Sequence, residues 1–222
     1  MEPLHSWDLT PKEAVQLQKR LRSRVHTDLP LPEPEKIAGV DVGYSRPLGL
    51  SVATVAVLAF PSLELVESAV ATTPTPFPYV PGLLSFRELP PILKALDRLS
   101  APPEMILVDG HGRAHPRRFG IACHLGLWLG IPTVGVGKTR LCGEYEEPEL
   151  TKGSLSPLLD GRELLGVVLR TRTGVRPVFV SVGYGLPLEA CVNWIRAVTP
   201  RYRLPEPIRQ AHNLAAKQTG SR

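Results

Sequence analysis

The run Met105-Ile-Leu-Val108 is entirely apolar, ends abruptly on Asp109 and is followed by glycines at positions 110 and 112. A short apolar run bounded in this way predicts a buried strand. In α/β proteins, ligands bind in the crevice outside the carboxyl ends of the strands. We therefore expect Asp109 to lie at such a crevice, where its carboxylate faces a ligand.

Apolar periodicity along the chain predicts consecutive strands first, then a strand–helix–strand unit, then closing helices. The turn Pro61-Ser62 predicts an antiparallel hairpin, and Pro90-Pro91 predicts that the helix breaks or kinks immediately after Glu88. We expect strands over residues 37–44, 51–60, 63–72, 105–109, 133–136, 164–170 and 178–182, and helices over 10–26, 82–99, 116–130, 188–198 and 206–216. This order favours an α/β fold with a central mixed β-sheet flanked by helices.

The composition is that of an ordinary globular protein, with 43% hydrophobic residues among 222. Because no long linker divides the chain, we expect one domain over residues 1–222, with a short disordered tail near 217–222. The longest apolar run, residues 52–60, is too short to cross a bilayer, and the three cysteines form no Cys-x-x-Cys pair. We expect a cytoplasmic protein that does not associate with a membrane. We also expect it to be a monomer with no obligate protein partner. The net charge of +5 permits nucleic-acid binding without proving it.

Two aspartates occupy strands that are otherwise small and apolar. Asp41 lies within the strand predicted over residues 37–44, and Asp109 ends the strand predicted over residues 105–109. An exposed edge position would explain either one alone, but strands tend to exclude aspartate. If the two strands are neighbours, both carboxylates converge and require a cation between them. Hard oxygen ligands select Mg²⁺ or Mn²⁺, with phosphate and water filling the other positions.

Basic residues near these strand ends suit a phosphate. Arg117 and Arg118 come shortly after Asp109 in the chain, and Lys138 ends the run Val134-Gly-Val-Gly-Lys138. Lys138 would either solubilise a strand end or meet a phosphate as a point charge. The complete phosphate-loop motif of an ATPase is absent. Cysteine catalysis is also disfavoured, because adjacent Cys123 and His124 diverge on the predicted helix.

A proline-rich segment, residues 73–81, holds Tyr79 between Pro78 and Pro81. It would be either a stiff connecting loop or the support of a projecting aromatic ring. Such a ring can enter a duplex and hold bases apart, with a stacking gain of about 1–3 kcal/mol per base.

Together these segments resemble the endonuclease V family, the deoxyinosine-directed nucleases of DNA repair. The likeness runs in order along nearly the whole chain. It is carried by Ile37-Ala-Gly-Val-Asp-Val-Gly43, Pro78-Tyr-Val-Pro-Gly-Leu-Leu-Ser-Phe-Arg-Glu88, Val108-Asp-Gly-His-Gly-Arg-Ala-His-Pro-Arg-Arg118, Ile131-Pro-Thr-Val-Gly-Val-Gly-Lys138 and Tyr202-Arg-Leu-Pro-Glu-Pro207, continuing to His212.

The resemblance implies an RNase H-like fold in which Asp41 and Asp109 bind Mg²⁺ and Glu88 and His212 complete the catalytic group. Taken alone, Glu88 would pair with Arg87 at a solvated helix end, and a lone helical histidine usually packs or faces water. By resemblance, Lys138 joins the catalytic residues and Glu88 the metal ligands. The residues expected to contact DNA are Pro78, Tyr79, Val80, Pro81, His115, Arg117 and Arg118.

We expect the deaminated base to be flipped into a pocket beside the glycine-rich loops, where the backbone is open enough to admit it. The glycines concerned are Gly110, Gly112, Gly135 and Gly137. His111 lies in the same loop but has no predicted role.

The activity implied by the resemblance is hydrolysis of the second phosphodiester bond 3′ to deoxyinosine, which leaves 3′-hydroxyl and 5′-phosphate ends. Two alternatives stay open: a ribonuclease that acts on inosine in RNA with the same site, and a catalytically inactive relative that binds lesions. One departure is Tyr184, because many family members have histidine there. A milder departure is Gly137, where alanine is common.

Overall fold

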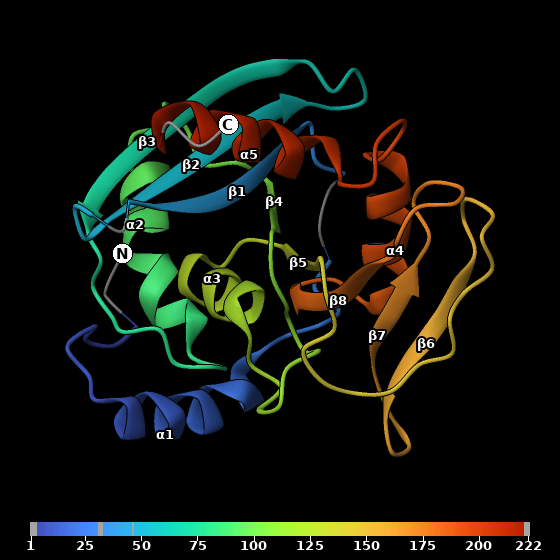
Figure 1. The fold of residues 1–222 in the computed structure, drawn as a ribbon, viewed down its shortest axis with the longest axis horizontal. Helices are drawn as coiled ribbons and strands as arrows, with labels where there is room; N and C mark the ends of the chain where they lie inside the picture. Colours follow the sequence, from blue (N-terminus) through green and yellow to red (C-terminus); the bar gives the residue numbers. More distant parts are fainter. Residues whose placement is uncertain (1–3, 31–32, 46, 220–222) are drawn as a thin grey trace.

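The computed structural model describes residues 4–30, 33–45 and 47–219. Its strands form one mixed eight-stranded sheet, in the order β3-β2-β1-β4-β5-β8-β7-β6 (Figure 1). The strands are β1 (Lys36–Ser45), β2 (Leu50–Ala59), β3 (Leu65–Pro74), β4 (Met105–Val108), β5 (Thr133–Gly137), β6 (Leu155–Asp160), β7 (Glu163–Leu169) and β8 (Val178–Tyr184). The helices are α1 (Pro11–Leu21), a 3₁₀ turn at Arg22–Arg24, α2 (Leu84–Leu96), α3 (Ile121–Leu129), α4 (Leu188–Ala197) and α5 (Glu206–Thr219).

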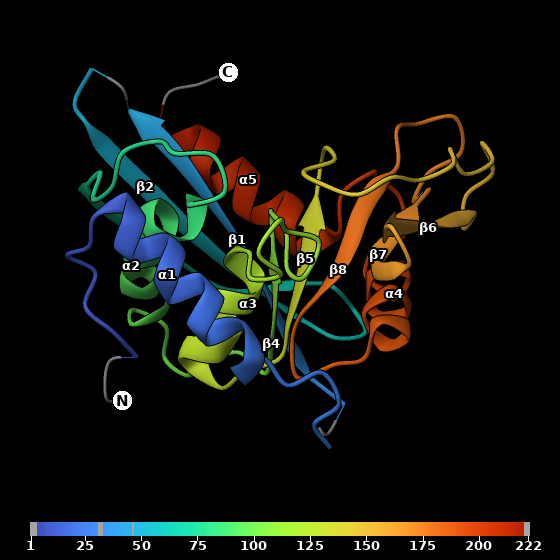
Figure 2. The same ribbon diagram turned by 90° about the horizontal axis from the view of Figure 1, so that it is seen from below.

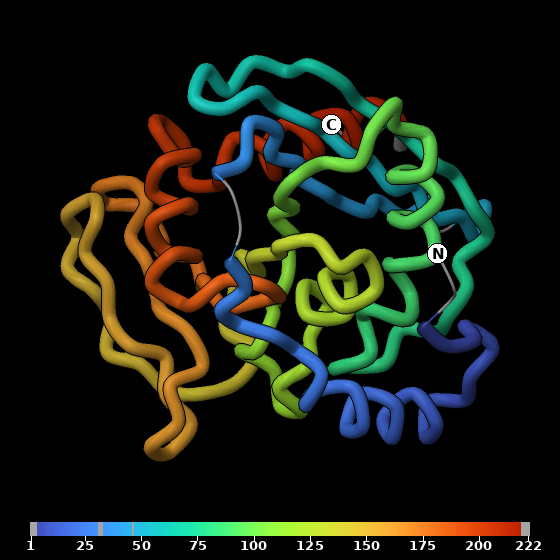
Figure 3. The backbone as a smooth tube through the Cα atoms, turned by 180° about the vertical axis from the view of Figure 1, so that it is seen from behind, coloured from blue at the N-terminus to red at the C-terminus, as the bar shows by residue number. Residues whose placement is uncertain are grey.

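Helices cover both faces of the sheet, as the sequence predicts. Helices α2 and α3 lie on one side of the sheet and α5 on the other (Figure 2). Buried side chains of α2 and α3 share one core cluster, and those of α4 and α5 share another. On the first face, α1 lies alongside α2 and α3 (Figure 3). Leu17 and Leu21 of α1 belong to one core cluster with Phe86 and Phe119. No helix within the described ranges is long and apolar enough to cross a membrane.

Of the break or kink predicted after Glu88, the break is wrong, because the helix continues through Pro90 and Pro91 to Leu96. Leu89, Ile92 and Ala95 are fully buried in the core beneath the sheet. Burial of a large apolar side chain contributes about 1.5–3 kcal/mol, so two or three of them offset the roughly 3 kcal/mol that an interior proline costs.

Other predicted boundaries also change. α1 ends at Leu21 rather than near residue 26, and α3 begins at Ile121 rather than 116. Residues 109–120 are therefore a loop, which we call the Asp109 loop. β6 was not predicted; its exposed and buried side chains alternate, and Pro157 interrupts the run. α5 extends to Thr219, so the part of the predicted tail over residues 217–219 is helical, and residues 220–222 lie outside the described residues.

The pairing of β1 with β4 positions the acidic residues. The two strands are parallel neighbours, and Val40 is the register partner of Val108. Asp41 and Asp109 are the next residues of each strand path, so both lie at the same edge of the sheet. The predicted hairpin is also present, because β2 and β3 pair antiparallel.

Candidate active site

Asp109 lies at the centre of a group of charged side chains at this edge. Its Oδ2 forms an ion pair with the Nζ of Lys138, which follows β5. Burial raises the pKa of Asp109, the neighbouring Asp41 carboxylate adds to the rise, and Lys138 opposes it. The two aspartates predicted to converge are thus close enough to repel each other.

Asp41 is contacted from α5, which packs on the face of the sheet opposite to α2 and α3. The Nδ1 of His212, on α5, lies 3.0 Å from Asp41 Oδ2. Gly39 in β1 allows this approach, since a Cβ at that position would lie 2.1 Å from the backbone carbon of Pro207 in α5. The close packing of α5 against β1 therefore brings His212 to the carboxylate.

Glu88 reaches the same group from α2. The hydroxyl of Tyr44 donates to Glu88 Oε1 over 2.7 Å, and the Arg87 guanidinium stacks 4.5 Å from the centre of the Tyr44 ring. Burial raises the pKa of Glu88 to about 8; the Tyr44 hydrogen bond opposes the rise, and Asp41 and Asp109 add to it. Sequence reasoning missed the role of Tyr44, because its partner is 44 residues away on another element.

These carboxylates suit a divalent cation. Their mutual repulsion is what a bound cation would relieve; in the structure Lys138 contacts Asp109, His212 contacts Asp41 and Tyr44 contacts Glu88. Within residues 4–30, 33–45 and 47–219, no group of three or more His, Cys, Asp or Glu side chains is arranged so that it could hold a metal ion. Such a group is not required, because Mg²⁺ is usually bound by one or two carboxylates, with water and phosphate completing its shell. The oxygen donors of Asp41 and Asp109 therefore fit a hard divalent ion.

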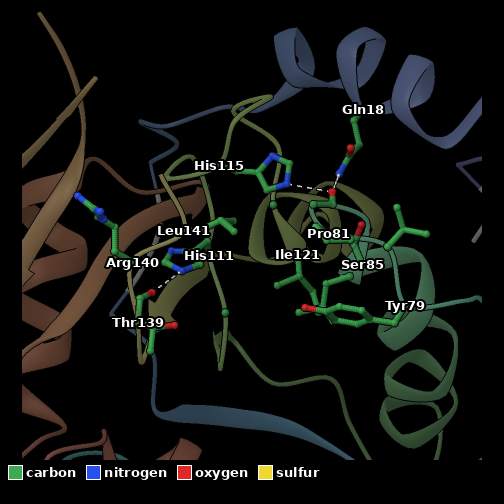
Figure 4. A pocket seen from close by; sticks show the side chains of 15 residues that line it. Gln18, Tyr79, Pro81, Ser85, His111, His115, Ile121, Thr139, Arg140 and Leu141 are labelled. Carbon is green, nitrogen blue, oxygen red and sulfur yellow. Dashed lines mark hydrogen bonds between the residues drawn. The ribbon is translucent and has the colours of Figure 1, made fainter. Parts of the chain in front are cut away.

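A pocket of about 260 Å³ is lined by Gly110, the residue that follows Asp109 in the chain. Figure 4 shows His111 and Thr139 on one side of it and Tyr79, Pro81 and Ser85 on the other. The side chain of Tyr79 stands at the rim, and the residue is 72% exposed. The pocket is also lined by Gln18, Val80, Gly82, Leu84, Gly110, His115, Gly120, Ile121, Arg140 and Leu141.

The predicted openness of the glycine-rich loops is wrong for all four glycines, since even at Gly110 an added Cβ would lie 2.6 Å from Ile121 Cγ2. A Cβ at Gly112 would lie 2.0 Å from the Val182 oxygen, one at Gly135 would lie 2.4 Å from the Gly112 nitrogen, and one at Gly137 would lie 2.3 Å from His111 Cε1. These three glycines allow close packing between loops and strands and are not among the residues that line the pocket. Gly110 is the member of the set that lines it.

The loop that carries Tyr79 is held through one carbonyl. Gly82 O accepts hydrogen bonds from Gln18 Nε2 at 3.1 Å, His115 Nε2 at 3.0 Å and Arg117 Nη2 at 2.7 Å. His115 is buried, and its burial lowers the pKa to about 4, so the ring is neutral near pH 7. We call residues 78–82 the Tyr79 loop.

The arginines expected to face phosphates have partners within the protein. Arg118 forms ion pairs with Asp160 and Glu163, and Arg117 binds Gly82 O and the Gln18 side chain. The structure thus gives Arg117 and His115 a place in supporting the Tyr79 loop and Arg118 a place in joining two strands to the Asp109 loop. Their contact with DNA stays a prediction.

Comparison with known proteins agrees with this geometry. A family model described as Endonuclease V matches residues 18–213. An endonuclease V of Nostoc punctiforme is 50% identical over 96% of this chain and 96% of its own. The crystal structure of an endonuclease V from Streptomyces avermitilis has a TM-score of 0.91 at 46% identity, covering 97% of this chain and 95% of that one. The Ciona intestinalis endonuclease V, solved with DNA containing an inosine followed by a ribo-adenosine, has a TM-score of 0.84 at 27% identity, covering 96% of this chain and 99% of that one.

Proposed function

Because the chain belongs to the endonuclease V family, whose members are metal-dependent nucleases with an RNase H-like fold, we propose that it cleaves DNA at deaminated bases. The substrate is deoxyinosine-containing DNA, and the bond hydrolysed is the second phosphodiester 3′ to the lesion. The products carry 3′-hydroxyl and 5′-phosphate ends. The supporting observation is that Asp41 and Asp109 follow paired residues of neighbouring strands, and that the next residue, Gly110, lines a pocket with an exposed tyrosine.

Asp41 and Asp109 would hold Mg²⁺, and Mn²⁺ would be able to substitute for it. A bound ion polarises the phosphate and lowers the pKa of a bound water. Glu88 would supply a further oxygen ligand. His212, fixed on Asp41 through Nδ1, would orient the attacking water through Nε2 or accept its proton. The Lys138 amine, next to Asp109, would offset negative charge on the phosphate.

Tyr79 would hold the strand open from the rim while the base enters the pocket. A volume of about 260 Å³ lies just below the 300–1,000 Å³ usual for small-molecule sites, which suits a single base. Pro78, Val80 and Pro81 would stiffen the Tyr79 loop and touch the DNA. Of the four glycines expected around the base, Gly110 is the one supported by the pocket lining.

The proposed partner is DNA, bound by a cytoplasmic monomer. RNA is a second candidate substrate, because the relative from Ciona intestinalis was solved with a ribonucleotide directly after the inosine. Both substrates would use the same carboxylates.

The test uses 5′-labelled oligonucleotides of one sequence, with inosine or adenine at a single position, made as DNA and as RNA. In Mg²⁺, we expect the inosine DNA to be cut so that the labelled product ends one nucleotide beyond the inosine. Faster cleavage of the RNA would instead support the ribonuclease. Binding without cleavage of either strand would support an inactive lesion-binding protein and contradict the proposal.

A further inference from the structure

Lys138 lies in a short segment, residues 137–139, at the end of β5, and Arg203 binds the backbone of this segment. Arg203 Nη2 donates to Lys138 O at 2.6 Å and to Pro177 O at 2.9 Å, while its Nε donates to Arg176 O at 2.9 Å. One guanidinium therefore joins the end of β5 to the residues that precede β8.

The opposite side of the segment is held by His111. Its Nε2 lies 3.0 Å from Thr139 O, and because a carbonyl only accepts, the hydrogen must be on Nε2. The ring also fills the space beside Gly137, where a Cβ would lie 2.3 Å from Cε1. The backbone on either side of Lys138 is thus fixed from two directions.

Arg203 is itself anchored. The Thr171 hydroxyl donates to Arg203 O at 2.6 Å, and α5, which carries His212, begins three residues later at Glu206. Arg203 has no carboxylate within ion-pair distance among residues 4–30, 33–45 and 47–219, so its hydrogen bonds all go to backbone carbonyls. Burial and the neighbouring Arg176 lower the pKa of Arg203, and the charge of the Asp109 carboxylate opposes this shift.

We propose that Arg203, with His111 on the opposite side, is a positioning residue that sets the Lys138 amine against Asp109. Arg203 touches neither the substrate nor the reacting phosphate, and it acts through Lys138. The inference rests on the proposed function only for its effect on catalysis. The contact between Lys138 and Asp109 can be measured separately.

Loss of Arg203 would leave three carbonyl oxygens without this donor and release the backbone that carries Lys138. A misplacement of about 1 Å near the reacting groups can lower a rate by roughly 100-fold. We therefore expect Arg203→Ala to lower the single-turnover cleavage rate by about 10- to 100-fold, with little change in the Kd for inosine DNA.

A double-mutant cycle with Lys138→Ala tests this relation. If Arg203 acts through Lys138, Arg203→Ala has almost no further effect on the rate once Lys138 is alanine. If the two losses multiply, Arg203 acts independently of Lys138 and the proposal is overturned. Arg203→Lys, which keeps the charge but not the three-way geometry, is the second variant if alanine prevents folding, and the same cycle decides.

An activity-independent measurement separates this inference from the proposed function. Reductive methylation followed by mass spectrometry reports how reactive each lysine is. In the wild type the Asp109 ion pair should protect Lys138, and in Arg203→Ala the labelling of Lys138 should rise to that of exposed lysines such as Lys94. Unchanged protection would overturn the inference, whereas failure of the wild type to cut inosine DNA would contradict only the proposed function.

Arg196→Ala is the matched control. Arg196 Nη2 also donates to a backbone carbonyl, Gly153 O, at 2.9 Å, and in the described part of the chain no side-chain hydrogen bond or ion pair joins it to residues 137–139. We expect it to leave both the cleavage rate and Lys138 labelling unchanged. A comparable loss in this variant would mean that any carbonyl-binding arginine matters, which would contradict a specific role for Arg203.

Discussion

Glu88 lies partly buried on α2, next to the two strand-end aspartates, and its pKa is raised to about 8 by burial and by their charges. Because the folded state binds this proton more tightly than the unfolded chain, whose glutamate has a pKa of 4.5, protonated Glu88 stabilises the fold at low pH. This contribution is lost as the pH rises towards 8. A divalent cation among the carboxylates would reverse the effect by favouring the charged forms.

We therefore predict that the free energy of unfolding of the metal-free protein falls as the pH rises from about 4.5 to about 8. Glu88→Gln should flatten this decline, because glutamine does not titrate. Urea unfolding in chelator at several pH values measures the decline in the free energy of unfolding for both proteins. An equally steep decline in Glu88→Gln would show that other groups cause the pH dependence.

The role proposed for Tyr79 can be tested separately from that of the carboxylates. Since its ring stands at the pocket rim, we predict that Tyr79→Ala reduces the preference for inosine over adenine DNA by about 5- to 150-fold, equivalent to one lost stacking contact of about 1–3 kcal/mol. Mg²⁺ affinity, measured by calorimetry, should not change. Loss of Mg²⁺ binding would contradict this division of roles.

The sequence predicts some of these residues for physical reasons and others only by resemblance. Asp41 and Asp109 can be recognised because strands exclude aspartate except where it has a use. Glu88 and His212 carry no such local signal, since helices hold many exposed glutamates and histidines. Arg118 was expected to contact a phosphate because its actual partners cannot be recognised from the local sequence. These partners, Asp160 and Glu163, lie more than 40 residues further along the chain.

At the level of elements, the Tyr79 loop depends on donors from α1 and the Asp109 loop. We predict that Arg117→Ala, which removes a 2.7 Å hydrogen bond to Gly82 O, weakens binding of inosine DNA by loosening this loop. The salt dependence of binding decides between this role and direct phosphate contact. A supporting role leaves the slope of log K against log[salt] unchanged, whereas loss of a phosphate contact lowers it by about 0.9.

The packing of α5 on β1 gives a second prediction at this level. In Gly39→Ala, the new Cβ would meet the Pro207 backbone at 2.1 Å, so α5 must shift away from β1. We expect overpacking to destabilise the protein by about 1–3 kcal/mol. Cleavage should also slow, because His212 moves with the helix. Thermal unfolding and single-turnover rates check both effects, and a fast, stable Gly39→Ala would contradict the tight contact.

Element prediction succeeded where apolar runs were long and failed where tertiary packing overrides local preference. The core strands stand out because they are uniformly apolar. The prolines of α2 are tolerated because Leu89 and Ile92 are buried on either side of them. The end of the sheet at β6 has a weaker signal, since its exposed residues alternate with buried ones.

For the whole molecule, the sequence predicts a mixed sheet with helices on both faces but not the order of its strands. Pairing of β5 with β8 rather than with the next strand in sequence depends on contacts across some 45 residues. This pairing shapes the candidate site. The end of β5 leads to Lys138, and the residues before β8 bind Arg203. These two segments meet at the edge of the sheet occupied by Asp109.

The central claim is that Asp41 and Asp109, brought together by parallel β1 and β4, carry out metal-dependent cleavage of inosine DNA. The most direct measurement is the single-turnover nicking rate of wild type, Asp41→Ala and Asp109→Asn, in Mg²⁺ and in chelator. We predict that the wild type cuts only with Mg²⁺ and that each substitution lowers the rate by about 1,000-fold or more while inosine DNA still binds. Nicking by either variant at the wild-type rate, or by the wild type in chelator, would contradict the claim.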